Sequence, residues 1–182
     1  DKGIDLGSLY EHQKHLTPEQ IDKAMAIGKE LGVLYANQKL TPEQIDKALD
    51  IGKDLYSLYS YKKLSPEQIN KGIDIGKSLW CLYANQNLTP ENIDKAMDKG
   101  MKLDVLYISQ ILTPEQRDKA MDKGEELWSL YMGQKNLTSK QIDKAIDIGK
   151  YLEYLYTYQE NLTPENIDHA IDKGIALDIL YK

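Results

Sequence analysis

Hydrophobic and polar positions repeat along this chain with a nearly constant period. Each unit opens with a leucine, a threonine or serine and usually a proline, and apolar residues then recur every three or four positions. In one copy these positions are Ile45, Ala48, Leu49, Gly52, Leu55, Tyr56 and Tyr59. Such spacing is typical of one face of an α-helix. Because the period is 24 or 25 residues, the sequence predicts an all-α tandem helical repeat, with units beginning at Thr17, Thr41, Ser65, Thr89, Thr113, Thr138 and Thr163.

The start of each unit carries strong helix-start signals. In the copy that begins at Thr41, the threonine is a favoured N-cap and Pro42 suits the first helical position. Gln44 completes a capping box with the threonine, and Leu40 pairs with Ile45 as a hydrophobic staple. The sequence therefore predicts that a helix begins here in every copy.

The end of this helix is harder to place. No consistent capping residue follows the glycine at Gly52 or its counterparts, and the apolar spacing continues beyond it. We therefore expect one helix of roughly 18–20 residues per repeat, about 30 Å long, with successive helices antiparallel in a curved α-solenoid. The alternative is two short helices per repeat, broken at the glycine.

The repeats fill the chain. We interpret residues 1–182 as a single helical-repeat domain in which a partial repeat, 1–16, precedes seven whole ones. Because residues 1–6 align with the middle of a unit, we expect the chain to be a fragment of a longer array.

Two further residue types, a glycine and a tyrosine, each recur at a fixed position of the repeat and so form a column in the aligned copies. Glycine costs about 1 kcal/mol inside a helix, so we expect it to permit close packing of a neighbouring helix. Since the chain contains no phenylalanine, we expect the tyrosine hydroxyl to find a polar partner. The columns are Gly3, Gly28, Gly52, Gly76, Gly100, Gly124, Gly149 and Gly174, and Tyr10, Tyr35, Tyr59, Tyr83, Tyr107, Tyr131, Tyr156 and Tyr181.

Composition and charge narrow the classes of partner. The formal net charge is −6, which disfavours nucleic acid and anionic membrane surfaces, because both attract basic proteins. No apolar run approaches the length of a membrane span, so no membrane insertion is expected. The single cysteine excludes an intrachain disulfide framework. No targeting segment is recognisable in these residues, and the localisation is left open.

The sequence offers little catalytic or metal-binding chemistry. Aspartates four residues apart recur, as at Asp46 and Asp50, and they are interpreted as a solvated helix face rather than a cation site. The three histidines do not form a constellation, and no phosphate loop or nucleophile motif is present. We therefore predict a protein that is not an enzyme and has no cofactor or metal.

The predicted function follows from the places where the copies differ. Repeat arrays commonly present surfaces for partners, so we expect binding of a protein or peptide. The candidate partner-binding residues break the repeat: Tyr56, Tyr61, Trp80, Trp128, Tyr154 and Arg117, with Tyr151 and Tyr158 as further irregular aromatics. The alternatives are a structural array that self-associates through its ends and a designed repeat protein without natural function.

Overall fold

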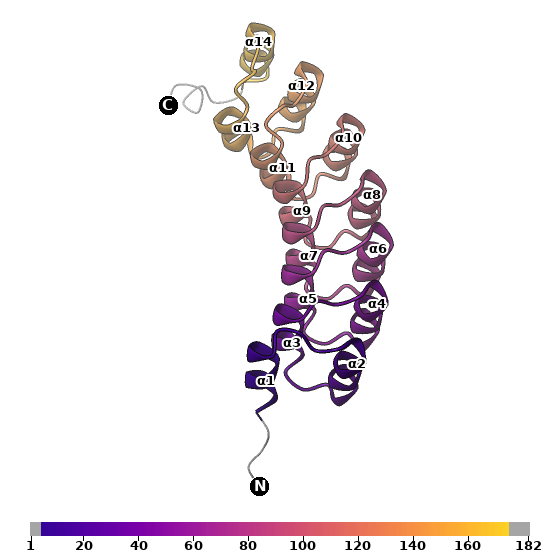
Figure 1. The fold of residues 1–182 in the computed structure, drawn as a ribbon. Coiled ribbons are helices and arrows are strands. Elements are labelled where there is room, and N and C mark those ends of the chain that lie inside the picture. Colours follow the sequence, from indigo (N-terminus) through magenta and orange to yellow (C-terminus); the bar gives the residue numbers. More distant parts are fainter. Residues whose placement is uncertain (1–4, 175–182) are drawn as a thin grey trace. The chain divides into compact units, whose positions relative to one another are not determined.

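The structure, a computed structural model, describes residues 5–174 and confirms a tandem helical repeat (Figure 1). Within these residues all regular structure is helical. Gly3 and Tyr181 lie outside the described residues. Each repeat from the one at Thr17 to the one at Thr138 contains a longer helix, here called an A helix, followed by a shorter B helix. In the described residues, the partial first repeat contributes a B helix and the repeat at Thr163 an A helix. The A helices are α2 (Pro18–Ile27), α4 (Pro42–Ile51), α6 (Pro66–Ile75), α8 (Pro90–Lys99), α10 (Pro114–Lys123), α12 (Ser139–Ile148) and α14 (Pro164–Asp172). The B helices are α1 (Leu6–His12), α3 (Leu31–Asn37), α5 (Leu55–Tyr61), α7 (Leu79–Asn85), α9 (Leu103–Ser109), α11 (Leu127–Gly133) and α13 (Leu152–Tyr158).

The prediction of one long helix per repeat is therefore wrong, and the two-helix alternative is correct. The A helix α4 ends at Gly52, whose φ of 65° lies in the left-handed region. A second left-handed residue, Asp54 with φ 50°, then precedes the B helix α5. The B helix α5 begins without a side-chain cap hydrogen bond. The absence of a capping residue in the sequence therefore did not mean that the A helix continued past the glycine.

The glycine column serves backbone conformation rather than close packing. Its described members have φ between 65° and 74°, a region that glycine adopts without steric cost. A Cβ added at Gly100 or Gly124 would meet nothing within 4 Å. The predicted packing notch is thus wrong, and the residue is needed because it ends the A helix.

The chain divides into two compact units, one ending at Lys95 and the other beginning at Ala96. In each unit the A helices and the B helices form separate layers (Figure 1). In the first unit, α1, α3, α5 and α7 pack in series, and α4 packs against α6. In the second unit, α9, α11 and α13 pack in series, as do α10, α12 and α14.

The core of each unit lies between these layers. From α3 to α11, each B helix buries its first leucine and, further along, a leucine and tyrosine pair such as Leu58 and Tyr59. The A helix buries residues such as Ala48 and Leu49 against them. Burying such side chains contributes about 1.5–3 kcal/mol for each large apolar residue. The repeated apolar pattern thus identifies most of the core, but it wrongly includes Tyr56, which is half exposed, because the predicted helix continued through the turn.

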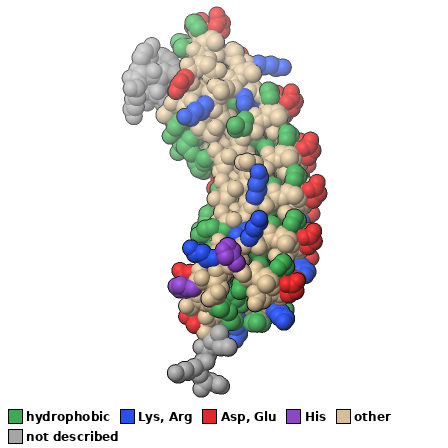
Figure 2. All heavy atoms as spheres, viewed as in Figure 1, with side chains coloured by type: hydrophobic (Ala, Val, Ile, Leu, Met, Phe, Trp, Pro, Cys, Tyr) green, Lys and Arg blue, Asp and Glu red, His purple; other side chains and the backbone are tan. Residues whose placement is uncertain are grey.

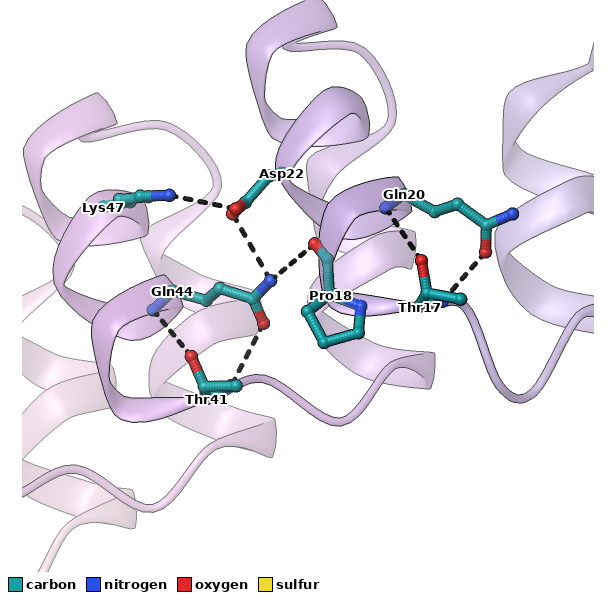
Figure 3. A network of polar contacts seen from close by, with 7 residues as sticks. All are labelled: Thr17, Pro18, Gln20, Asp22, Thr41, Gln44 and Lys47. Carbon is teal, nitrogen blue, oxygen red and sulfur yellow. Dashed lines mark hydrogen bonds and ion pairs between the residues drawn. The ribbon is translucent and has the colours of Figure 1, made fainter.

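Side-chain amides in the A layer join neighbouring repeats (Figure 3). Gln44 accepts a hydrogen bond from the N–H of Thr41 at 3.1 Å, which completes the capping box. The same amide donates to the carbonyl of Pro18 in the preceding repeat at 2.9 Å and to Asp22. Equivalent amides are those of Gln68, Asn92, Gln141 and Asn166. The capping residue therefore also bonds the preceding A helix.

A second set of amides joins the B layer. Gln134, at the end of α11, donates to the carbonyls of Tyr107 and Gln110 at 2.7 and 2.8 Å. The side-chain oxygen of Gln134 accepts a hydrogen bond from the N–H of Leu112 at 3.0 Å. Gln38, Gln86 and Gln159 make the corresponding bonds to their own preceding repeats. These buried glutamines satisfy backbone groups that the end of each B helix leaves open.

The surroundings of the recurring tyrosine differ from those that the sequence predicts. The hydroxyls of Tyr10, Tyr35, Tyr59, Tyr107, Tyr131 and Tyr156 are buried with no hydrogen-bond partner, so the predicted polar partner is wrong for these residues. The Tyr59 hydroxyl lies against α6, where a Cβ on Gly72 would approach it to 3.0 Å. Burial raises the pKa of Tyr35 to about 12, with a smaller contribution from Asp54.

We predict that Gln134→Leu lowers the free energy of unfolding by about 3 kcal/mol, because two carbonyls and one N–H lose their partner in a buried position. Lys62 stands where most repeats have this glutamine. Lys62→Gln is therefore expected to raise stability by about 1 kcal/mol. Urea titrations followed by circular dichroism measure both changes. Equal stability of Gln134→Leu and the unsubstituted chain would contradict the proposed role of the amide.

A second prediction concerns the left-handed turn. Lys102→Gly should raise the free energy of unfolding by about 0.5–1 kcal/mol, because Lys102 has φ 57° and glycine adopts this conformation freely. Gly124→Ala should lower it by about 1 kcal/mol although the added methyl has free space. Denaturant titration of the two variants checks the pair, and the opposite order would refute the conformational explanation.

A third prediction tests the buried tyrosine. Tyr131→Phe should increase the free energy of unfolding by about 1 kcal/mol, because it removes a buried hydroxyl without a partner. Tyr61→Phe, at an exposed residue, serves as the control and should leave stability unchanged. A loss of stability in Tyr131→Phe would show that its hydroxyl is hydrogen-bonded.

Candidate functional site

The irregular aromatic residues lie mainly on the outer surface of the B helices. In the unit that ends at Lys95, Tyr56 of α5 and Trp80 of α7 place their ring centroids 5.4 Å apart. Their exposed fractions are 50% and 48%. Both residues directly follow the buried leucine that begins their helix, so neighbouring repeats bring them side by side. Two of the predicted binding residues thus meet.

A larger group lies in the unit that begins at Ala96. Tyr154 of α13 has its ring centroid 6.0 Å from that of Trp128 of α11. It also lies 6.3 Å from Tyr158 in a stacked arrangement and 6.5 Å from Tyr151 in an edge-on one. We call these four residues the Tyr154 cluster. Figure 2 shows hydrophobic side chains gathered at the surface in the part of this unit that carries α11 and α13.

The local backbone positions the cluster. Trp128 follows the first leucine of α11, while Tyr154 and Tyr158 are four residues apart on α13 and therefore share a face. Tyr151 has φ 55° and precedes α13, so a bulky side chain occupies a left-handed position and is 46% exposed. This conformation is unfavourable for such a residue. The other described turns have the same conformation with Glu, Asp, Ser or Lys in this place, so what distinguishes Tyr151 is the aromatic ring that it holds on the surface.

A carboxylate orients the tryptophan. The indole N–H of Trp128 donates to a carboxylate oxygen of Glu126 at 2.7 Å. Glu126 is itself the left-handed residue that precedes α11. The indole therefore has a preferred orientation before any partner binds.

The structure places the two remaining candidates elsewhere. Tyr61, 60% exposed, lies at the end of α5, where it lines a separate hollow with Lys62 and Asn85. Arg117 takes the position of the staple isoleucine in α10, and its guanidinium donates to the carbonyl of Asn136 at 2.6 Å. Arg117 therefore supports the following connector rather than the Tyr154 cluster.

The repeated carboxylates pair with the next repeat on the A-helix side. Lys119 lies 2.8 Å from Asp98, and its hydrogen bond holds the pKa of Asp98 below the usual range. Corresponding pairs are Lys71 with Asp50, Lys95 with Asp74, Lys144 with Asp122, and His169 and Lys173 with Asp147. Acidic side chains line this edge in Figure 2. These exposed pairs each contribute little to stability, but they match one repeat to the next.

Other chemistry is sparse in the described part of the chain. No group of histidine, cysteine and carboxylate side chains among residues 5–174 is arranged to hold a metal ion. The one cysteine, Cys81, is buried. Within the same residues, none of the helices has the length and apolar character needed to cross a membrane.

Comparison of the chain with protein-family models, with curated proteins and with solved structures finds no match.

Sequence reasoning identified the aromatic residues but missed the amides. Tyr151 and Tyr158 belong with Trp128 and Tyr154, although only the last two were chosen as binding candidates. Glu126, which orients Trp128, was not singled out. The buried glutamines at the ends of the B helices recur at a fixed place in most repeats, and this regularity was the available signal.

Proposed function

We propose that the protein is a non-enzymatic repeat scaffold that binds a protein or peptide through the Tyr154 cluster. The observation that carries the proposal is the partly exposed group of four aromatic rings on α13, its preceding turn and α11. Tyrosine and tryptophan bury a large apolar area when a partner covers them, with little loss of side-chain entropy. They are also enriched among residues that dominate the binding energy of interfaces.

The surroundings support a preformed surface. The Glu126 hydrogen bond orients Trp128, and the buried Gln159 amide fixes the end of α13 to the carbonyl of Tyr131 at 2.8 Å. A partner would therefore meet rings that are already arranged, which reduces the entropy lost on binding. The left-handed conformation at Tyr151 belongs to the turn of the repeat, but the turn does not require an aromatic side chain, because Glu, Asp, Ser or Lys stands there in other described repeats. A binding role accounts for the ring.

The proposal is tested by selecting peptides that bind the purified protein from a displayed library. Binding is followed by tryptophan fluorescence in a Trp80→Phe background, where Trp128 is the remaining tryptophan. We expect Trp128 fluorescence to change on binding. The protein variant Tyr154→Ala should bind the same peptides more weakly by about 2 kcal/mol, roughly thirtyfold, as expected for an aromatic residue at the centre of an interface.

Ile111→Ala is the matched control, since Ile111 is 88% exposed and lies outside the cluster. It should leave the affinity unchanged. Circular dichroism establishes that the variants are folded. If no selected peptide depends on Tyr154, or if Ile111→Ala weakens binding equally, the Tyr154 cluster is not the binding surface.

A further inference from the structure

We infer that the Tyr154 cluster takes a basic segment, an extended peptide that presents arginine side chains. This inference rests on the proposed function and specifies the chemistry of the partner. Two properties of the surface support it: the accessible faces of its aromatic rings and the carboxylates that border them.

The rings offer favourable contacts to a cation. The face of an aromatic ring carries negative charge density, and a guanidinium within about 6 Å of its centre is attracted to it. Tyr151 is 46% exposed, so a partner can reach part of its ring. Arginine stacks on such rings better than lysine because its guanidinium is planar and less strongly hydrated.

The border of the cluster is predominantly acidic. Glu126 contacts Trp128 directly, and Glu153 precedes Tyr154 on α13 with an exposed side chain. Glu125 and Glu126, together with Asp104, line a hollow of about 510 Å³ between the starts of α9 and α11. The one basic residue of that lining is Lys102. The hollow thus extends the cluster, through Glu126, to a region where carboxylates outnumber basic groups.

These features suit one kind of side chain. A guanidinium can stack on a ring and at the same time donate two hydrogen bonds to a carboxylate. The apolar stem of the arginine can lie along Met101 and Leu103, which also line the hollow. An extended peptide with spaced arginines would therefore contact both the rings and the hollow.

The first unit provides an internal comparison. The Tyr56 and Trp80 pair is preceded by turns that contain Lys53, Asp54 and Lys77. The corresponding turns before α11 and α13 contain Glu125, Glu126 and Lys150. Carboxylates therefore outnumber lysines in the turns beside the Tyr154 cluster, whereas lysines outnumber carboxylates beside the Tyr56 and Trp80 pair. Basic peptides should prefer the Tyr154 cluster to the Tyr56 and Trp80 pair.

The test uses a peptide of eight residues that alternates arginine with glycine and serine, and the same peptide with citrulline in place of arginine. Citrulline has a similar shape but no charge. In the Trp80→Phe protein, we expect the arginine peptide to change Trp128 fluorescence and to bind about tenfold more tightly than the citrulline peptide. Lysine in place of arginine should give an intermediate affinity.

The double variant Glu126→Gln and Glu153→Gln should weaken the arginine peptide about tenfold, while the amide oxygen introduced by Glu126→Gln can still accept the indole hydrogen bond. Because the whole chain is acidic, the control removes the same number of carboxylates from the A-helix side by Glu43→Gln and Glu67→Gln. This control should bind as the unsubstituted chain does.

Equal affinity for the arginine and citrulline peptides would overturn the inference, as would equal weakening in the two double variants, which would indicate nonspecific attraction. In either case, uncharged library peptides whose binding depends on Tyr154 would leave the proposed function standing. Failure of every peptide to bind the Tyr154 surface would reject both.

Discussion

The paired left-handed residues between helices are the constraint on which the rest of the structure depends. Gly52 and Asp54, with φ of 65° and 50°, end one helix and redirect the chain into the next within a single repeat. A continuous helix would present one apolar stripe, whereas the turn produces separate A and B layers with a core between them. The outer face of the B layer, where the aromatic residues lie, exists only because of this turn.

The interfaces between repeats combine apolar burial with an unusual number of side-chain amides. Apolar contacts alone are not directional, so they would allow one repeat to slide along the next. Gln44 and Gln134 bond specific carbonyls of the preceding repeat and are themselves buried, so a displaced register would leave these groups unsatisfied. The amides thus fix the register within each unit, and their regular recurrence explains why the sequence repeats so closely.

The sequence predicted the starts of the A helices and most of the core, but it predicted neither the ends of the A helices nor the starts of the B helices. Thr41, Pro42 and Gln44 act locally, so their pattern could be interpreted without knowledge of the fold. The left-handed residue before each B helix from α3 to α13 is Glu, Asp, Ser, Lys or Tyr. Of these only Asp is enriched in that conformation, so the residue types give no consistent signal. The pairing of Trp128 with Tyr154 depends on how adjacent repeats pack, which requires the two-helix arrangement to be known.

The contrast between two aromatic positions shows why function is better sought in the irregular residues. Tyr131 belongs to the tyrosine column that recurs in each repeat, and it is fully buried in the core. Its replacement would therefore affect folding before it affected any partner. Tyr151 occurs at a left-handed position where other described repeats have acidic, basic or small residues. Folding does not require an aromatic ring there, since the other repeats form the same turn without one. Contact with a partner, as proposed above, would give that ring a role that packing does not.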